Sequence, residues 1–110
     1  MSATTTLAFF GIRFAIEENE IESFEERTHL HQRLARQFAL DHYWGNFEEP
    51  GERYYSFIGK RLAIIGAEND SEKSYSSSEL EQIQRETQSK ILSAGIEGEV
   101  ALYVQSMPDA

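Results

Sequence analysis

The chain has no cysteine among its 110 residues. This absence excludes disulfide bonds, thiolate nucleophiles and cysteine-based zinc sites. It also fits a reducing compartment, where proteins fold without disulfides. Residues 1–6 lack the basic segment of a secretory signal, and no apolar run approaches the roughly 18 residues that span a bilayer. We therefore expect a cytoplasmic protein.

Recognisable catalytic motifs are missing as well. The sequence contains no glycine-rich phosphate loop, no H-E-x-x-H pair and no nucleophile elbow. His29 and His31 stand two residues apart on an expected helix, so they point to different faces and do not share a metal ion. His31 is expected in the core, while His42 has no serine, cysteine or carboxylate placed near it in sequence to form a recognisable catalytic set. We expect a non-catalytic protein without a cofactor.

Basic residues are few relative to acidic ones. The chain carries 19 acidic and 10 basic residues, which gives a formal charge of −9. Such a surface repels phosphate backbones and anionic lipid headgroups, and this argues against nucleic acid and membrane as partners. A basic protein partner is compatible with the charge, but so is solubility alone.

The composition indicates one domain over residues 1–110. Hydrophobic residues make up 40% and aromatic residues 12%, which is enough material for a single core. We expect this ordered core over about residues 7–105, and we expect mobility in the polar stretch 66–77, which has Tyr75 as its one apolar anchor.

A repeated octapeptide organises the chain. Phe9–Ile16 recurs as Phe57–Ile64, and five of the eight positions are identical. Both copies alternate in the way that is typical of β-strands. With helical periodicity, capping residues and the Pro50-Gly51 turn signal, the pattern predicts six elements. These are strands at 7–16, 42–47, 53–65 and 98–105, and long helices at 20–41 and 77–94.

The helix at 77–94 has clear end signals. Ser76 with Glu79 forms a capping box at its start, and Gly95 is placed to end it. Its expected buried stripe is Leu80, Ile83, Thr87, Ile91 and Leu92.

The expected element order defines the fold class. Strand, helix, strand, strand, helix, strand predicts an α+β protein of the ferredoxin-like, split βαβ type. Its four-stranded antiparallel sheet carries both helices on one face. The first and third strands are the central neighbours, and two βαβ halves imply that these two run in parallel. If 42–47 is not a strand, the alternative is a three-stranded β-α-β-α-β unit.

The sheet face without helices is the main candidate surface. Aromatic and guanidinium side chains alternate there along the two repeats, and two more aromatic residues come from the strand at 42–47. The candidate residues are Phe9, Arg13, Phe57, Arg61, Tyr43 and Trp44. Since an apolar sheet face needs cover, we expect it to dimerise or to bind a protein partner. The alternative is a cleft in which Arg13 and Arg61 bind a small anion, with or without catalysis.

Acidic residues follow both copies of the repeat. Glu18 and Glu20 follow the first copy, and Glu68 and Asp70 follow the second. The proposed fold places both loops at one end of the sheet, where their oxygen atoms could bind Ca²⁺ or Mg²⁺. The spacing does not match an EF-hand loop, and an ordinary acidic helix start is the favoured explanation of Glu20. Divalent-cation binding is therefore the weakest of the three hypotheses.

Overall fold

We analysed a computed structural model that describes residues 5–47, 53–66 and 69–107. The strands are β1 (Thr5–Ala15), β2 (Asp41–Phe47), β3 (Arg53–Ile65) and β4 (Ala101–Met107), and the helices are η1 (Glu18–Glu20), α1 (Ile21–Glu25), α2 (Leu30–Gln37) and α3 (Ser77–Ala94). The strands form one antiparallel sheet in the order β2-β3-β1-β4, so the expected class, α+β with a four-stranded antiparallel sheet, is confirmed. Of the helices described, none has the length and apolar character that a bilayer crossing needs.

The two copies of the repeat lie side by side at the centre of the sheet, but they run antiparallel. The prediction that β1 and β3 run in parallel was wrong, because a period of two fixes which face a residue takes and not the direction of its strand. Gly11 pairs with Gly59, Phe9 with Arg61 and Arg13 with Phe57. Within residues 9–13 and 57–61, each residue therefore stands opposite the mirror position of the other copy, and the local two-fold symmetry is centred on the glycine pair.

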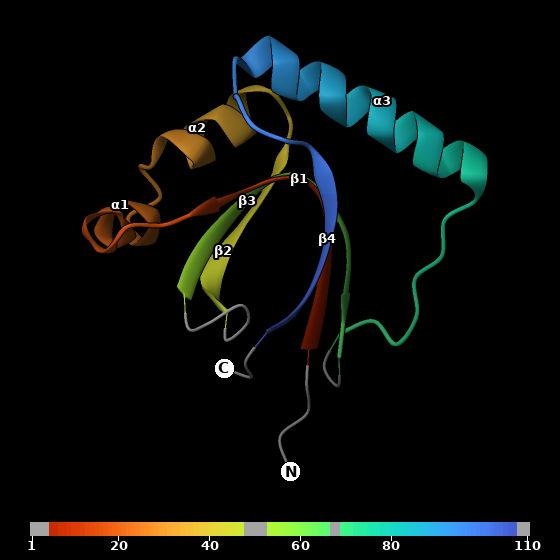
Figure 1. Cartoon of the computed structure of the whole chain (residues 1–110), viewed down its shortest axis with the longest axis horizontal. Helices are drawn as coiled ribbons and strands as arrows, with labels where there is room; N and C mark the ends of the chain where they lie inside the picture. Colours follow the sequence, from red (N-terminus) through yellow and green to blue (C-terminus); the bar gives the residue numbers. More distant parts are fainter. Residues whose placement is uncertain (1–4, 48–52, 67–68, 108–110) are drawn as a thin grey trace.

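The glycine pair lies where the two parts of the sheet meet, because β4 pairs with β1 only up to Gly11 and β2 pairs with β3 only up to Gly59. Figure 1 shows β1 and β3 bending at the same level, so that the sheet has two arms. One arm holds β2, and the other holds β4. A Cβ atom on Gly11 would stand 2.1 Å from the Ile58 carbonyl oxygen, and one on Gly59 would stand 2.3 Å from the Phe10 oxygen. The two backbones approach so closely that only glycine fits either position.

The inner face of the bent sheet is an aromatic core. Its buried residues are Leu7, Phe9, Phe47, Tyr55 and Phe57, with Tyr43, Ile64 and Tyr103 packed against them. Cα atoms of the two edge strands, β2 and β4, come within 8 Å of each other as the arms close over this core. The register skips one residue of β3 between the Phe9–Arg61 and Ala8–Ala63 pairs, and this bulge turns Ile64 towards the inner face.

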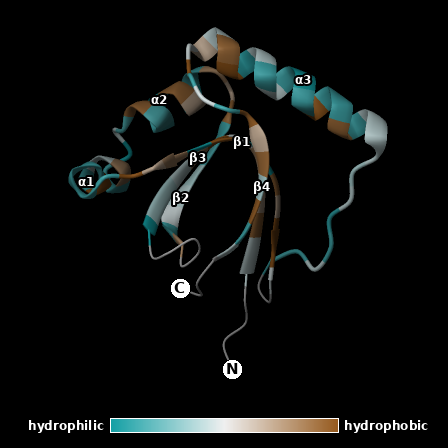
Figure 2. Cartoon of the chain, in the orientation of Figure 1, coloured by the Kyte–Doolittle hydropathy of each residue, from teal (hydrophilic) through white to brown (hydrophobic). Residues whose placement is uncertain are grey.

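The outer face carries helices α2 and α3. Ile12 and Ile58 of the central strands pack there with Ala35 of α2 and Ile91 of α3. Figure 2 shows that α3 is largely hydrophilic, with isolated hydrophobic turns, and lies across the top of the bend. Its cap residues were predicted correctly: Ser76 Oγ accepts from the Glu79 N–H at 3.1 Å, and Gly95 ends the helix with φ 71°.

The expected helix over 20–41 is replaced by three shorter helices, η1, α1 and α2, which end at Gln37, before β2 begins at Asp41, so the structure has more than the two helices predicted. Arg27 takes a left-handed φ of 63° between α1 and α2. His29 then begins α2, and its ring accepts from the His31 N–H at 3.1 Å. A polar side chain that forms a hydrogen bond with the nearby backbone can end one helix and start the next. Hydrophobic periodicity gives no sign of such a break.

Two further expectations about side chains differ from the structure. Leu92 was placed on the buried stripe of α3 but is 81% exposed, whereas Thr87 and Ile91 are buried as expected. The strand at 42–47 is confirmed as β2. The turn at Pro50-Gly51 lies outside the described residues.

Candidate functional site

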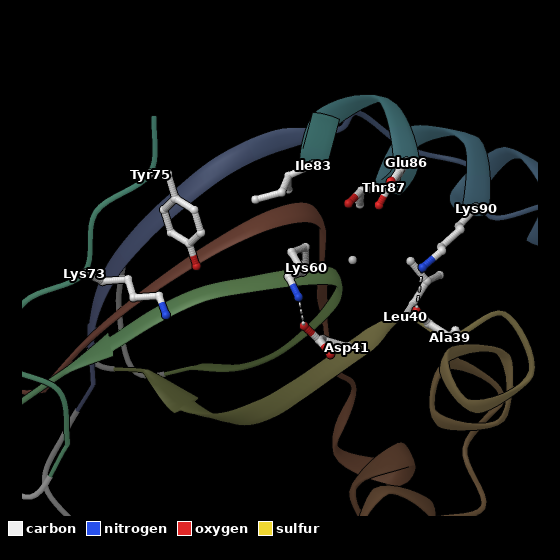
Figure 3. A pocket seen from close by; sticks show the side chains of 11 residues that line it. Ala39, Leu40, Asp41, Lys60, Lys73, Tyr75, Ile83, Glu86, Thr87 and Lys90 are labelled. Atoms are coloured by element: carbon white, nitrogen blue, oxygen red, sulfur yellow. Dashed lines mark hydrogen bonds and ion pairs between the residues drawn. The ribbon is translucent and has the colours of Figure 1, made fainter. Parts of the chain in front are cut away.

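The main candidate site is a pocket between α3 and the outer face of the sheet. It has a volume of about 380 Å³. Gly59 and Lys60 of β3 form its floor, the start of β2 forms one wall, and the turns of α3 that carry Ile83 and Thr87 lie above it (Figure 3). This volume is within the range of small-molecule sites, which is roughly 300–1,000 Å³.

Every lysine in the chain lines this pocket. The sequence has three lysines, and they come from β3 (Lys60), from the segment before α3 (Lys73) and from α3 itself (Lys90). In Figure 3 the Lys73 side chain reaches in from one side and Lys90 descends from α3 on the other, with Lys60 between them. The chain is strongly acidic overall, so this arrangement concentrates positive charge at one place.

The lysine ammonium groups have few partners in the described chain. Lys60 Nζ lies 3.9 Å from Asp41 Oδ2, and both side chains are about half exposed, so this ion pair is weak. Lys90 Nζ donates to the Ala39 carbonyl at 3.1 Å. Lys73 Nζ lies 5.7 Å from the centre of the Tyr75 ring. Since an ammonium carries three donors, hydrogen-bonding capacity remains for a ligand.

The carboxylates at the pocket do not cancel its charge. Asp41 Oδ2 accepts from the Arg61 main-chain N–H at 2.9 Å, and Glu86 accepts from Gln82 on its own helix at 3.0 Å. Three ammonium groups against these two carboxylates leave one positive charge in excess. The pocket can therefore attract a small anion, while Ile83 offers apolar contact to the rest of the molecule.

Local sequence explains how the pocket is shaped. Ala39 takes a left-handed φ of 55° after α2, and its exposed carbonyl faces Lys90. Tyr75 donates to the Leu62 carbonyl at 2.6 Å, which anchors the segment before α3 to the sheet. Gly59 leaves the floor without a side chain.

A second polar cluster lies on the outer face around a buried serine. Ser56 Oγ is 2.7 Å from His42 Nε2 and 3.1 Å from His31 Nδ1. The hydroxyl has one proton, so it donates to one ring and accepts from the other. Burial, and to a smaller extent the neighbouring histidines, lower the pKa of both His31 and His42 to about 4.

The third histidine links this cluster to η1. His29 Nδ1 accepts from the His31 main chain, so its Nε2 carries the proton and donates to Glu20 Oε2 at 2.8 Å. The hydrogen bond from His29 lowers the pKa of the Glu20 carboxyl. Ser56 is fully buried, so this cluster is a polar network inside the packed chain and not an accessible nucleophile.

Four of the predicted residues lie on two different faces of the sheet. Phe9 and Phe57 contact each other with ring centres 5.5 Å apart, and both are fully buried within one chain. These two rings therefore need no partner molecule to cover them. Dimerisation through this face stays a prediction. Tyr43 packs on the inner face, whereas Trp44 packs against Phe24 on the other side, at 5.5 Å.

The two predicted arginines do not converge. Arg13 lies between the rings of Tyr55 and Tyr103, at 4.6 and 4.8 Å, and donates to Gln105 at 2.8 Å. Arg61 is exposed. The register places them four positions apart along the ladder, on opposite sides of the glycine pair. A cleft that uses both guanidinium groups is therefore not formed.

The acidic loops do not lie together as expected. Because β1 and β3 are antiparallel, the chain leaves them at opposite ends of the sheet, so Glu18 and Glu20 are separated from Asp70. Glu68 lies outside the described residues. Within the part of the chain that is described, no three histidine, aspartate or glutamate side chains are grouped to hold a metal ion.

Fold and site together define an α+β protein with a lysine-lined pocket between a helix and the outer face of a bent antiparallel sheet. No protein-family model, no curated protein and no solved structure matches the chain. Sequence reasoning missed all three pocket lysines. The one signal in the sequence was that lysine is scarce, since only three of the ten basic residues are lysine.

Proposed function

We propose that the protein binds a small anionic molecule in the lysine-lined pocket. The observation that carries this proposal is that the three lysines of an acidic chain, from three separate elements, line one pocket of about 380 Å³. If the three lysines were placed at random on an acidic surface, they would lie apart from one another, each beside carboxylates. The ligand class is a phosphate- or carboxylate-bearing small molecule whose less polar part contacts Ile83.

Binding of simple anions tests this proposal. Inorganic phosphate, pyrophosphate and citrate are titrated into the protein and followed by calorimetry and by the midpoint of thermal unfolding. A ligand that binds only the folded chain raises the midpoint as its concentration exceeds Kd. We expect saturable binding by at least one probe, weakened about tenfold, or 1.4 kcal/mol, by Lys73→Gln or Lys90→Gln.

Arg85→Gln is the matched control. Arg85 is an exposed cation on the same helix as Lys90, but it pairs with Glu81 at 3.3 Å outside the pocket. This variant removes the same charge and should leave the affinity unchanged. No saturable binding at millimolar probe, or an equal loss in Arg85→Gln, would contradict the proposal.

The ferredoxin-like, split βαβ arrangement is not matched. The strand order keeps β1 and β3 at the centre of the sheet, but these two strands run antiparallel, whereas two βαβ halves need them to run in parallel.

A further inference from the structure

The lysine-lined pocket continues beyond Lys73. A second hollow of about 240 Å³, which we call the edge pocket, is lined by residues 61–64 of β3 and by Asn69, Asp70 and Lys73. Lys73 lines both pockets, and Lys60 of the first is followed directly along the strand by Arg61 of the second. Because successive Cα atoms are about 3.8 Å apart, one small molecule is long enough to occupy both pockets.

The edge pocket exists because β2 stops pairing with β3 at Gly59. Beyond it, the structure describes no strand beside residues 60–65 of β3 on the side away from β1, and the segment before α3 lies there instead. The Gly66 N–H donates to the Asp70 carbonyl at 3.1 Å, and the Tyr75 hydroxyl donates to the Leu62 carbonyl at 2.6 Å. These two hydrogen bonds hold the segment near both of its ends, so it forms a wall opposite the strand.

The side chains of the edge pocket combine hydrogen-bond donors and acceptors. The Arg61 guanidinium only donates, the Asp70 carboxylate only accepts, and the Asn69 amide does both. A hydroxyl group both donates and accepts, so it can bond to any of the three. A second anionic group would be repelled by Asp70. The edge pocket therefore suits the hydroxyl groups of a ligand and not another acidic group.

We propose that the anion in the lysine-lined pocket is the phosphate of a sugar phosphate, and that the hydroxyl groups of the sugar bind in the edge pocket. This inference rests on the proposed function, since it takes the lysine-lined pocket as the anion site. A phosphate monoester has three terminal acceptor oxygens, which match the ammonium groups of Lys60, Lys73 and Lys90. The C–H groups of the sugar supply the less polar surface that contacts Ile83.

Calorimetry with matched probes tests this inference on the full chain. The reference probes are inorganic phosphate and hexyl phosphate, which has a phosphate and a carbon chain but no hydroxyl groups. The sugar phosphates are glucose 6-phosphate, fructose 6-phosphate and ribose 5-phosphate. We expect at least one of them to bind about tenfold more tightly than both reference probes, because it alone forms hydrogen bonds in the edge pocket. We call this ratio of Kd values the sugar preference.

Asp70→Ala distinguishes hydroxyl binding from simple attraction of charge. The substitution removes a carboxylate that repels phosphate, so a site that responds to charge alone would bind every probe more tightly and keep the sugar preference. We expect instead that the sugar preference falls about tenfold, because a hydrogen bond to a charged group is lost. Arg61→Ala should lower it as well. Both residues are exposed, so the variants should fold, and circular dichroism checks this.

Glu72→Ala and Arg53→Ala are the matched controls. Glu72 is an exposed acid of the same segment as Asp70, Arg53 is an exposed base of the same strand as Arg61, and both lie outside the two pockets. Each control removes the same charge as its partner variant and should leave the sugar preference unchanged. A sugar preference that survives in Asp70→Ala, or that falls equally in the controls, overturns the inference.

Failure of this inference can be told apart from failure of the proposed function. If inorganic phosphate binds and Lys90→Gln weakens it, but no sugar phosphate is preferred to hexyl phosphate, the edge pocket does not bind hydroxyl groups and the anion site stands. If no phosphate probe binds at millimolar concentration, the anion site and the sugar site are overturned together.

Discussion

The two faces of the bent sheet are formed by the same strands, but they have different roles. On the inner face, Phe9 and Phe57 are fully buried among other aromatic rings, and Arg13 is held between two tyrosines. On the outer face, α3 stands far enough from β3 to leave the lysine-lined pocket. The inner face is packed for stability, whereas the outer face keeps room and charge that the fold itself does not need.

The glycine pair connects the two faces. Gly11 and Gly59 let β1 and β3 approach closely where the sheet bends, and the bend brings the aromatic rings of both arms together. Gly59 is also part of the floor of the pocket. One pair of residues thus permits both the closed inner face and the open site on the outer face.

The largest expected effect comes from adding a methyl group at this pair. In Gly11→Ala the new Cβ would lie 2.1 Å from the Ile58 carbonyl oxygen, so the central strands must separate. We expect the free energy of unfolding to fall by about 3 kcal/mol or more, measured by urea denaturation. The loss would come from steric strain between the new Cβ and the backbone of β3, which has no alternative position.

Gly45→Ala in β2 is the control for that substitution. A Cβ at Gly45 would meet the Tyr43 ring at 3.7 Å, which is ordinary van der Waals contact. Its effect should stay below about 1 kcal/mol. Equal losses in the two variants would show that the glycine pair is not the special point of the sheet.

A smaller effect is expected from acid, which acts on the histidine cluster of the outer face. The pKa of His31 and of His42 is about 4 in the folded chain, against 6.5 for an ordinary histidine. The unfolded chain therefore binds more protons between pH 6.5 and 4, and stability falls as the pH is lowered through this range. After discounting for partial exposure, we expect a loss of about 2 kcal/mol between pH 7 and 5.

Denaturation of the wild type and of His42→Gln at both pH values measures this loss. The variant removes one of the two groups, so it should show about half the pH dependence while being less stable at pH 7. A wild-type chain that is equally stable at pH 7 and 5 would contradict the burial of neutral histidines around Ser56.

The sequence sufficed for those elements whose signals are local. The alternation along β1 and β3 and the caps of α3 at Ser76 and Gly95 predicted their elements closely, because each signal lies within the element that it defines. The break at Arg27 was missed, since a left-handed residue leaves no mark on hydrophobic spacing. Strand direction was missed because alternation is the same in both directions.

No local sequence signal predicted the candidate site. Lys60, Lys73 and Lys90 are separated by 13 and 17 residues, and they meet only because α3 crosses the outer face above β3. The predicted arginines show the opposite case. Their equal positions in the two repeats suggested a shared site, but antiparallel pairing places equivalent residues on opposite sides of the symmetry centre.

The smallest expected effect separates those two arginines. Arg13→Lys keeps the charge but loses the planar group that stacks between Tyr55 and Tyr103. We expect it to lower the free energy of unfolding by about 1 kcal/mol. Arg61→Lys should change it by less than about 0.5 kcal/mol, because Arg61 is exposed and its main-chain bond to Asp41 does not depend on the side chain. Urea denaturation of both variants makes the comparison, and equal losses would mean that packing does not distinguish the two equivalent arginine positions of the repeat.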